Sequence, residues 1–357
     1  MSEVPDFAAI HDELRSVAAG LLAKDTIDWP LLVSAGWIGL DAPEVAGGAG
    51  ATFAEVAVIC EELGRAAAAT GYLGGAVLAI GALNALHPNE SRDALLKAVV
   101  SGSIRTAIAL PGAGDPAPFE LATTRLGWRI HGSAAFVPDA AGAQRLLLPA
   151  RDADGVAVLV DVAAESPGLT VTEQPVLDET RRLATVTAEG VEVDEDAVWQ
   201  FDGDPDSGLD ALTDRAALAV ACDSLGIAQA MLDTTVSYTG VRQQFGRPIG
   251  SFQAVKHACA DMLVSLAVSR QLVTAAVQAV AAGADAGVAA SMAKAHATGA
   301  AVDIAGKAMQ LHGGIGYTWE SGIHVYLKRA ALNRSLFGSP AAHRQTLAER
   351  YTESRSH

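Results

Sequence analysis

The chain has 357 residues, of which 50% are hydrophobic and only 5% aromatic, and it carries a formal net charge of −16 with a pI near 4.9. This charge argues against a nucleic acid or an anionic membrane as a partner, because both attract basic protein faces. Its cysteines, Cys60, Cys222 and Cys259, lie far apart without metal-ligand spacing, which argues against a disulfide framework or a metal site.

The N-terminal sequence MSEVPDFAAIHDEL lacks the basic and then apolar layout of a signal peptide. Polar residues also interrupt the Ala-rich stretches before they reach membrane-spanning length. We therefore expect a cytoplasmic protein. Its length indicates two or three domains.

The first region, residues 1–103, is expected to be a helical domain. Apolar residues recur there at three- and four-residue spacing, as in FAEVAVICEELGRAAAA from Phe53. The segment WIGLDAPEVAGGAGA from Trp37 interrupts this pattern, since Pro43 and the following glycines prevent a continuous helix.

The second region, residues 104–205, changes to short β-branched runs separated by turn residues, such as RLATVTAEGVEV. These runs predict a small β-barrel, followed by an exposed acidic connection, QFDGDPDSGLDA. Helical periodicity then returns over residues 206–357. Long segments with short joints predict an antiparallel four-helix bundle, with helices over residues 216–241, 252–282, 287–311 and 321–336. The predicted fold class is therefore α+β, mainly α.

Two motifs at helix ends in the bundle stand out. RQQFGRPIGSFQAVKHACADM from Arg242 ends one helix, turns through glycines and a proline, and opens the next helix. QLHGGIGYTWE from Gln310 places two glycines at another helix end, where they allow a left-handed turn and close approach to a ligand. Either motif alone could be a simple helix joint. Together, the Arg side chains, a helix N-terminus and the glycines favour two walls of a groove for a phosphate-bearing cofactor.

These motifs, with AGWIGLDAPEVAGGAGATFAEVAVICEELGR near the N-terminus, resemble the acyl-CoA dehydrogenase family over nearly the whole chain. The resemblance implies that FAD is the cofactor. It also implies that the first motif holds the FAD pyrophosphate and adenosine, and that the second closes the same site, commonly across a subunit boundary. The FAD-binding positions implied for this chain are Arg242, Gln244, Phe245, Ile249, Gln253, Gln310, Gly313 and Gly314.

The family reaction is α,β-desaturation of an acyl-CoA thioester, in which a carboxylate takes the α-proton and the β-hydrogen leaves as hydride to the flavin. The family usually supplies this base as Glu in a YEG motif, and here LFG places Phe337 there. A second family location, 26 residues before Arg242, is Ala216. No catalytic residue is therefore expected in this chain. The nearest carboxylates on that helix are Asp214 and Asp223, and Asp223 could be an atypical base or a structural partner of a nearby polar group.

The flavin-ring side departs from the family as well. The family motif TEPGAGSD corresponds here to residues that keep the loop's glycines but lose its flavin-facing polar groups, namely Ala109, Leu110, Pro111, Gly112, Ala113, Gly114 and Asp115. Where the family has a Thr that contacts the flavin, FVPD places Pro138, which offers neither a hydroxyl nor a backbone N–H.

The nucleotide side of the FAD site is thus retained, whereas the ring side and the base are not. This combination resembles the less catalytic subunit of actinobacterial α2β2 acyl-CoA dehydrogenases, which often act on bulky thioesters such as steroid side-chain CoA. The implied partners are a second dehydrogenase-like subunit, an acyl-CoA and electron-transfer flavoprotein. Two alternatives stay open: a homomeric dehydrogenase or related flavin oxidase with an atypical base, and an FAD-free structural bundle protein.

Several other polar residues of the bundle are expected to be structural. His312 is expected at a helix end or against the cofactor. Lys256 and His257 could reach a ligand phosphate or lie on an exposed helix face. In the run HVYLKRA, we expect Lys328 and Arg329 to lie in solvent.

Overall fold

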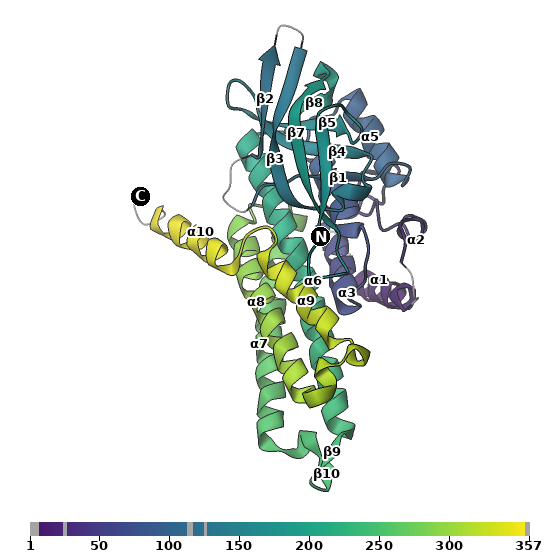
Figure 1. The fold of residues 1–357 in the computed structure, drawn as a ribbon, viewed down its shortest axis with the longest axis vertical. Coiled ribbons are helices and arrows are strands. Elements are labelled where there is room, and N and C mark those ends of the chain that lie inside the picture. Colours follow the sequence, from purple (N-terminus) through teal and green to yellow (C-terminus); the bar gives the residue numbers. More distant parts are fainter. Residues whose placement is uncertain (1–6, 24–26, 113–116, 125–126, 354–357) are drawn as a thin grey trace, which may run out of the picture.

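The structure is a computed structural model that describes residues 7–23, 27–112, 117–124 and 127–353. It confirms the expected order of a helical region, a β-region and a helical bundle (Figure 1). The described part of the N-terminal region contains a π-helical turn at Leu73–Leu78 and five α-helices: α1 (Phe7–Leu22), α2 (Trp29–Ser34), α3 (Phe53–Arg65), α4 (Ala79–Asn84) and α5 (Glu90–Val100).

The β-region is one sheet with strand order β6-β7-β3-β2-β4-β5-β8, and β1 pairs with β4 off this path. Apolar residues of β1 to β5 and β7 share one buried cluster, so the sheet curves around its own core as expected for a small barrel. The strands are β1 (Thr106–Ile108), β2 (Phe119–Thr124), β3 (Gly127–Pro138), β4 (Arg145–Arg151), β5 (Ala157–Ala163), β6 (Leu169–Gln174), β7 (Leu183–Val193) and β8 (Val198–Gln200).

Strand β4 shows how this sheet joins the rest of the molecule. Leu146 and Leu148 lie in the core of the sheet, whereas Leu147 between them lies in the large core shared with the helices. Side chains of a strand alternate between faces, so a continuous apolar run is buried on both sides. The β-region is therefore packed against the helices rather than tethered beside them.

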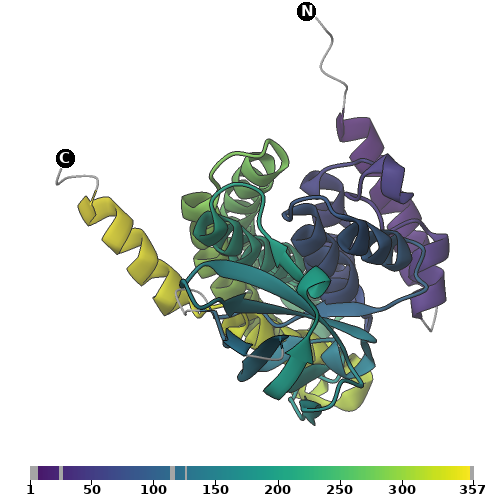
Figure 2. The ribbon, with the colours of Figure 1, turned by 90° about the horizontal axis from the view of Figure 1, so that it is seen from above.

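The C-terminal region contains α6 (Pro205–Val241), α7 (Gln253–Ala281), α8 (Gly287–His312), α9 (Ile323–Ser335) and α10 (Pro340–Glu353). The first four lie alongside one another, and α10 projects away from the body of the molecule (Figures 1 and 2). Helix α6 begins earlier than the expected residue 216. Asp204 caps it by accepting a hydrogen bond from the Ser207 N–H at 2.9 Å, and Pro205 occupies its first turn, so much of the expected exposed connection is helical.

Two glycines allow α3 and α6 to cross in close contact. A Cβ atom at Gly64 would lie 1.9 Å from the carbonyl oxygen of Asp223, and one at Gly226 would lie 1.9 Å from that of Glu61. No side chain fits in either place without moving a backbone. This crossing fixes the N-terminal region against the bundle.

Helices α6 and α7 are long and apolar enough to span a membrane by length and composition. The most apolar segment of α6 is 89% buried in the fold, as in a core helix of a folded domain, whereas that of α7 is only 22% buried. Helix α7 therefore presents an apolar outer face, on which Leu263, Val264 and Val268 are 56%, 64% and 44% exposed.

Candidate functional site

The two motifs predicted to bind FAD lie at the same end of the bundle. After α6, a short hairpin pairs β9 (Gln243–Gln244) with β10 (Arg247–Pro248), and the N–H of Ile249 donates to the carbonyl of Arg242 at 2.8 Å. Phe245 and Gly246 form its tip with φ values of +53° and +76°. A two-residue hairpin turn needs left-handed backbone, which Gly246 adopts readily and Phe245 does not.

The second motif reaches this end through the last turn of α8. His312 stacks on Tyr238 of α6, with ring centroids 4.3 Å apart, and its Nδ1 lies 2.7 Å from the carbonyl oxygen of Ala308. Gly313 then leaves the helix at φ +61° and ψ −140°, a conformation open only to glycine. His312 is therefore a helix-end packing residue, and its stacking places the start of the second motif next to the end of α6.

Most of the predicted FAD-binding positions face outward. Phe245 is 91% exposed, Ile249 is half-buried, and the other positions are exposed, namely Arg242, Gln244, Gln253, Gln310, Gly313 and Gly314. Within the described part of the chain, the side chains of Arg242 and Gln244 form no hydrogen bond or ion pair, so their donors are free for a ligand. Lys256 and His257 are exposed on the same end of α7.

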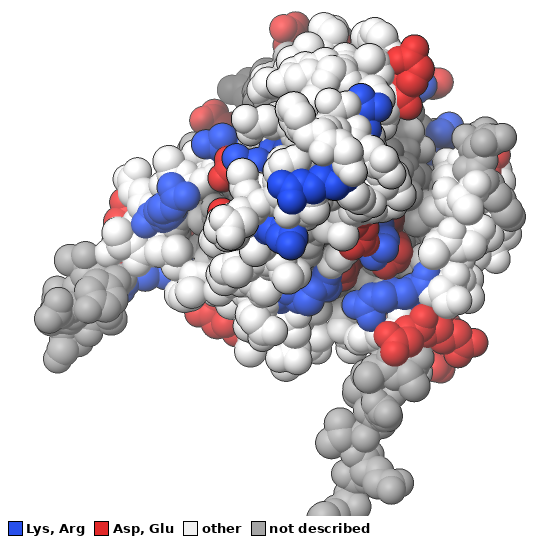
Figure 3. All heavy atoms as spheres, turned by 90° about the horizontal axis from the view of Figure 1, so that it is seen from below, with Lys and Arg blue, Asp and Glu red and all other residues white. Residues whose placement is uncertain are grey.

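This end of the molecule also exposes basic side chains (Figure 3). Figure 3 views it directly and shows Lys and Arg side chains spread across the face, although the chain as a whole carries a net charge of −16. Free guanidinium donors, an exposed aromatic ring and bare glycine backbone fit the pyrophosphate and adenosine of FAD. They form an open surface that a second chain could complete.

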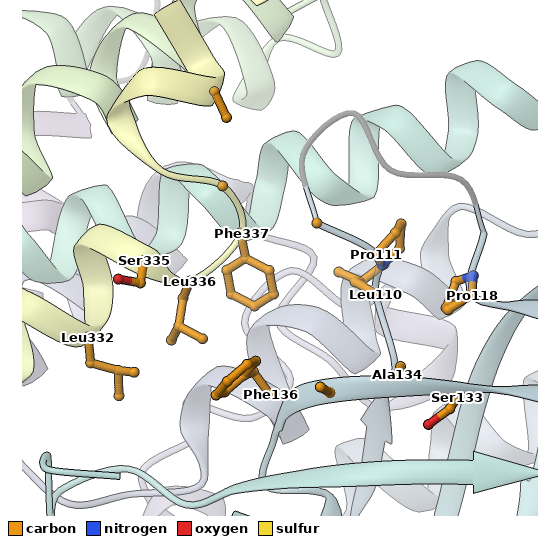
Figure 4. A pocket seen from close by; sticks show the side chains of 14 residues that line it. Leu110, Pro111, Pro118, Ser133, Ala134, Phe136, Leu332, Ser335, Leu336 and Phe337 are labelled. Atoms are coloured by element: carbon orange, nitrogen blue, oxygen red, sulfur yellow. The ribbon is translucent and has the colours of Figure 1, made fainter.

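A cavity of about 600 Å³ lies between the β-region and the junction of α9 with α10 (Figure 4). It brings together three segments that the sequence placed at the ring side of a flavin site: the loop after β1, the end of β3 and the LFG motif. The described residues that line it are Leu110, Pro111, Gly112, Pro118, Ser133, Ala134, Ala135, Phe136, Leu332, Ser335, Leu336, Phe337, Gly338 and Ala342. Ala113, Gly114 and Asp115 of the same loop lie outside the described residues.

Phe337 occupies the base position with its ring toward this cavity, and its side chain is almost buried (Figure 4). Two side chains hold the loop that carries Phe337. The Lys294 ammonium donates to the carbonyl of Gly338 at 2.6 Å, and His343 Nε2 lies 2.9 Å from the carbonyl oxygen of Phe337. Burial lowers the pKa of Lys294 to about 7. None of the described lining residues can accept a proton from a substrate.

Pro138 is buried at the end of β3 and does not line the cavity. The next residue, Asp139, was missed by the sequence reasoning. Burial raises the pKa of Asp139 to about 6, although the N–H of Gly74 donates to its Oδ2 at 2.9 Å. A Cβ at Gly74 would lie 2.6 Å from the carbonyl oxygen of Pro138, so this glycine is needed for the contact. In the sequence, Asp139 could have been noted because it directly follows Pro138.

Asp223 is a structural residue rather than a base. Its Oδ2 accepts hydrogen bonds from Arg329 Nε at 3.0 Å and Asn333 Nδ2 at 2.6 Å, and its Oδ1 lies 3.2 Å from Arg181 Nη2. Burial would raise the pKa of Asp223, but these arginines and the hydrogen bonds hold it below its usual value. A buried carboxylate that is already paired and stays ionised cannot take a substrate proton.

The same contacts correct the expectation for Arg329, which is 2% exposed instead of solvated. Its guanidinium also donates to the carbonyl of Ala68 at 2.7 Å and to Thr180 Oγ1 at 2.9 Å. It therefore links the bundle to both other regions. Asp214, the other carboxylate considered on α6, has its pKa raised to about 6 by burial, and it does not line the cavity.

This architecture of a helical region, a curved sheet and a bundle, with a nucleotide-binding end and a cavity between sheet and bundle, defines the acyl-CoA dehydrogenase class. The N-terminal domain model of acyl-CoA dehydrogenases matches residues 3–103, and the C-terminal domain model matches residues 210–352. The chain belongs to the acyl-CoA dehydrogenase family, whose members are FAD-dependent oxidoreductases acting on acyl-CoA.

Three similar proteins match this chain over nearly its whole length. The acyl-CoA dehydrogenase IpdE2 of Mycolicibacterium smegmatis is 32% identical, over 93% of this chain and 90% of that protein. A variant of the steroid ACAD Tcur3481-Tcur3483 is 30% identical, with a TM-score of 0.86 over 98% of this chain and 100% of that one. The ChsE4-ChsE5 complex of Mycobacterium tuberculosis is 27% identical, with a TM-score of 0.85 over 99% of this chain and 98% of that one.

Proposed function

We propose that this chain is a subunit of an FAD-dependent acyl-CoA dehydrogenase that binds the nucleotide half of the cofactor, while a partner subunit supplies the base. One observation carries the proposal. The cavity that contains the base position of this chain is lined, among the described residues, by no titratable side chain, and Phe337 stands where the family places its Glu. The opposite end of the bundle keeps every position of the nucleotide motifs.

The residues of this chain then act by binding. Arg242 and Gln244 would donate to the pyrophosphate of FAD, Phe245 would contact its adenosine, and Gly313 and Gly314 would let the backbone approach the cofactor. When bound, FAD supplies the hydride acceptor for the desaturation. Proton removal from the substrate takes place on the partner, because this chain holds Asp223 as an ionised structural group.

The uncovered face of α7 and the open nucleotide surface both favour an assembly. Two similar structures, Tcur3481-Tcur3483 and ChsE4-ChsE5, carry names of two proteins each. We infer an α2β2 assembly in the cytoplasm with electron-transfer flavoprotein as electron acceptor. The substrate class is a bulky acyl-CoA such as a steroid side-chain thioester, since one of these similar structures is described as a steroid ACAD.

Expression of the chain alone and with a neighbouring dehydrogenase-like gene product tests the proposal. We expect little flavin absorbance from the lone chain and about one FAD for each pair in the co-expressed complex. Arg242→Ala should reduce the FAD content of the complex, whereas Arg344→Ala, an exposed arginine on α10, should leave it unchanged. Acyl-CoA turnover by the lone chain would instead indicate a homomeric enzyme, and absence of flavin from both preparations would indicate an assembly protein.

A further inference from the structure

A second cavity, of about 440 Å³, lies where the N-terminal region meets the β-region. It is formed by the start of α2, the loop after α3, β1, the turn after β3 and the loop before β7. None of its described lining residues also lines the cavity beside Phe337, and the nucleotide motifs contribute no residue to it. Its volume lies within the range of small-molecule sites.

Two exposed arginines, Arg105 and Arg182, border this cavity. The backbone of both is fixed beside the turn after β3. The N–H of Asp139 donates to the carbonyl of Arg182 at 2.9 Å, and the carbonyl of Arg105 accepts from the Gln144 N–H at 2.8 Å. Within the described part of the chain, neither guanidinium group forms a hydrogen bond or an ion pair. Their donors are therefore available for a carboxylate, whose two oxygens match the planar guanidinium fork.

The carboxylates at the rim of the cavity are already engaged. Asp28 accepts a hydrogen bond from the Leu31 N–H at 3.0 Å as the cap of α2, and Glu179 lies 3.6 Å from the Lys328 ammonium. The charged side chains left without a partner at the mouth are therefore cationic. They disfavour a metal ion, and the described residues contain no cluster of metal-ligating side chains.

The wall of the cavity also contains two polar groups that a ligand could satisfy. Thr106 is 1% exposed, and its Oγ1 has no hydrogen-bond partner among the described residues. Asp139 accepts from Gly74 through one oxygen only, and because burial raises its pKa to about 6, its carboxyl is ionised at neutral pH. A buried hydroxyl without a partner costs free energy, so a polar ligand group at this wall would be stabilising.

Trp29 gives the cavity an apolar wall in a fixed position. Its indole N–H donates to the carbonyl of Gly102 at 3.1 Å. Its ring lies against Gly75, where a Cβ atom would be only 2.7 Å from Trp29 Cη2. An indole whose N–H is already bonded offers hydrocarbon surface, and a wall that is fixed before binding lowers the entropy cost when a ligand enters.

We propose that this cavity binds a small organic acid that carries a hydroxyl group. The carboxylate of the ligand pairs with Arg105 and Arg182 at the mouth. Its hydrocarbon body packs on Trp29, and its hydroxyl group donates to Asp139. The inference goes beyond the proposed function and does not depend on it, because the site lies within this chain and apart from the nucleotide motifs.

Isothermal titration calorimetry of the co-expressed complex with 3-(4-hydroxyphenyl)propionate tests the site, and 3-phenylpropionate is the matched acid without a hydroxyl group. We expect the hydroxylated acid to bind about 10-fold more tightly, because its hydroxyl donates to a charged group. Arg105→Ala should weaken the binding of both acids about fivefold or more. Asp139→Asn should reduce the preference for the hydroxylated acid to within about twofold. Arg344→Ala, an exposed arginine outside the lining, should change neither affinity.

Circular dichroism and FAD content are measured for every sample, so that loss of the fold and failure of the cofactor role are each seen separately. Saturable binding that Arg105→Ala weakens, together with a hydroxyl preference that Asp139→Asn removes, supports the site. Absence of saturable binding, or equal affinity in Arg105→Ala and the unmodified complex, overturns it. Equal binding of the two acids overturns the ligand class. If Asp139→Asn does not fold, Ala141→Trp at an exposed lining position decides instead, because it fills the cavity and should abolish binding.

Discussion

A single charge cluster at Asp223 joins the three regions of the molecule. Arg329 and Asn333 reach it from α9, and Arg181 reaches it from the loop before β7. Charges this deep are tolerated only when they are paired, so each partner depends on the others. The role considered for Asp223 as a base fails because its pairing with two arginines removes its basicity.

Asp223→Asn should destabilise the protein strongly, because it leaves two buried guanidinium groups without a counter-charge. We expect a loss of about 3 kcal/mol or more, by analogy with broken buried ion pairs, measured as a lower midpoint in thermal or urea unfolding. Asp233→Asn is the matched control. Asp233 pairs with Arg65 at 2.9 Å, but both side chains are nearly half exposed, so its loss should cost less than about 1 kcal/mol. Equal effects of the two substitutions would contradict the structural role of Asp223.

At the scale of elements, the connection between α9 and α10 depends on α8 beneath it. Lys294 donates to the carbonyls of Gly338 and Arg334, at 2.6 Å and 3.3 Å, and thereby satisfies oxygens at the end of α9. Its ammonium has no carboxylate partner among the described residues. The connection that carries Phe337 is therefore supported by a buried amine whose charge is easily lost.

Lys294 gives stability a pH dependence with a definite sign. Its pKa is about 7 in the folded chain, against an ordinary value of 10.5, so between these values the unfolded chain binds a proton that the folded chain does not. Stability should therefore rise with pH from about 7 to 8.5, by up to roughly 1 kcal/mol per pH unit. Lys294→Met should remove this slope. The pH range of 7 to 8.5 lies below 9.0, the ordinary pKa of the thiols of Cys60 and Cys222, whose pKa values are raised in the folded chain. Parallel slopes for the unmodified protein and Lys294→Met would exclude Lys294 as the cause.

The elements themselves could be predicted from the sequence because they follow local rules. Periodicity indicated the bundle helices, and the glycine motifs marked the ends of α6 and α8. The early start of α6 was not predicted, because its first residues are rich in acidic residues and glycine. The feature that starts the helix there is the cap at Asp204. Composition suggested a loop, whereas one capping side chain and a proline sufficed to begin the helix.

Burial of single polar residues could not be predicted in the same way. Arg329 stands in a run of polar and apolar residues that fits a solvated helix face, and only the position of Asp223, 106 residues earlier, accounts for its burial. Asp139 likewise depends on Gly74, which is 65 residues away. The sequence did identify three segments of the ring-side cavity, because each departs from a family motif, but the other lining residues and the apolar enclosure required the structure.

At the scale of the whole molecule, the outer face of α7 is too apolar to remain in water without cost. Leu263, Val264 and Val268 are uncovered in the single chain, and exposed apolar patches of this kind mark protein contacts. The chain carries a net charge of −16, so two copies or a similarly acidic partner would associate best through a face free of charge.

Val264→Asp should therefore weaken the assembly without unfolding the chain, because Val264 is 64% exposed and contributes little to the core. We expect light scattering to show a lower mass for the variant complex, while its helical circular dichroism stays unchanged. Val45→Asp makes the same replacement at a residue of the N-terminal region that is 88% exposed, and it should leave the mass unaltered. If Val264→Asp keeps the full mass, α7 is not a subunit contact. If the FAD content falls together with the mass, the nucleotide surface at the end of α6 depends on the same association, as expected for a cofactor shared between chains.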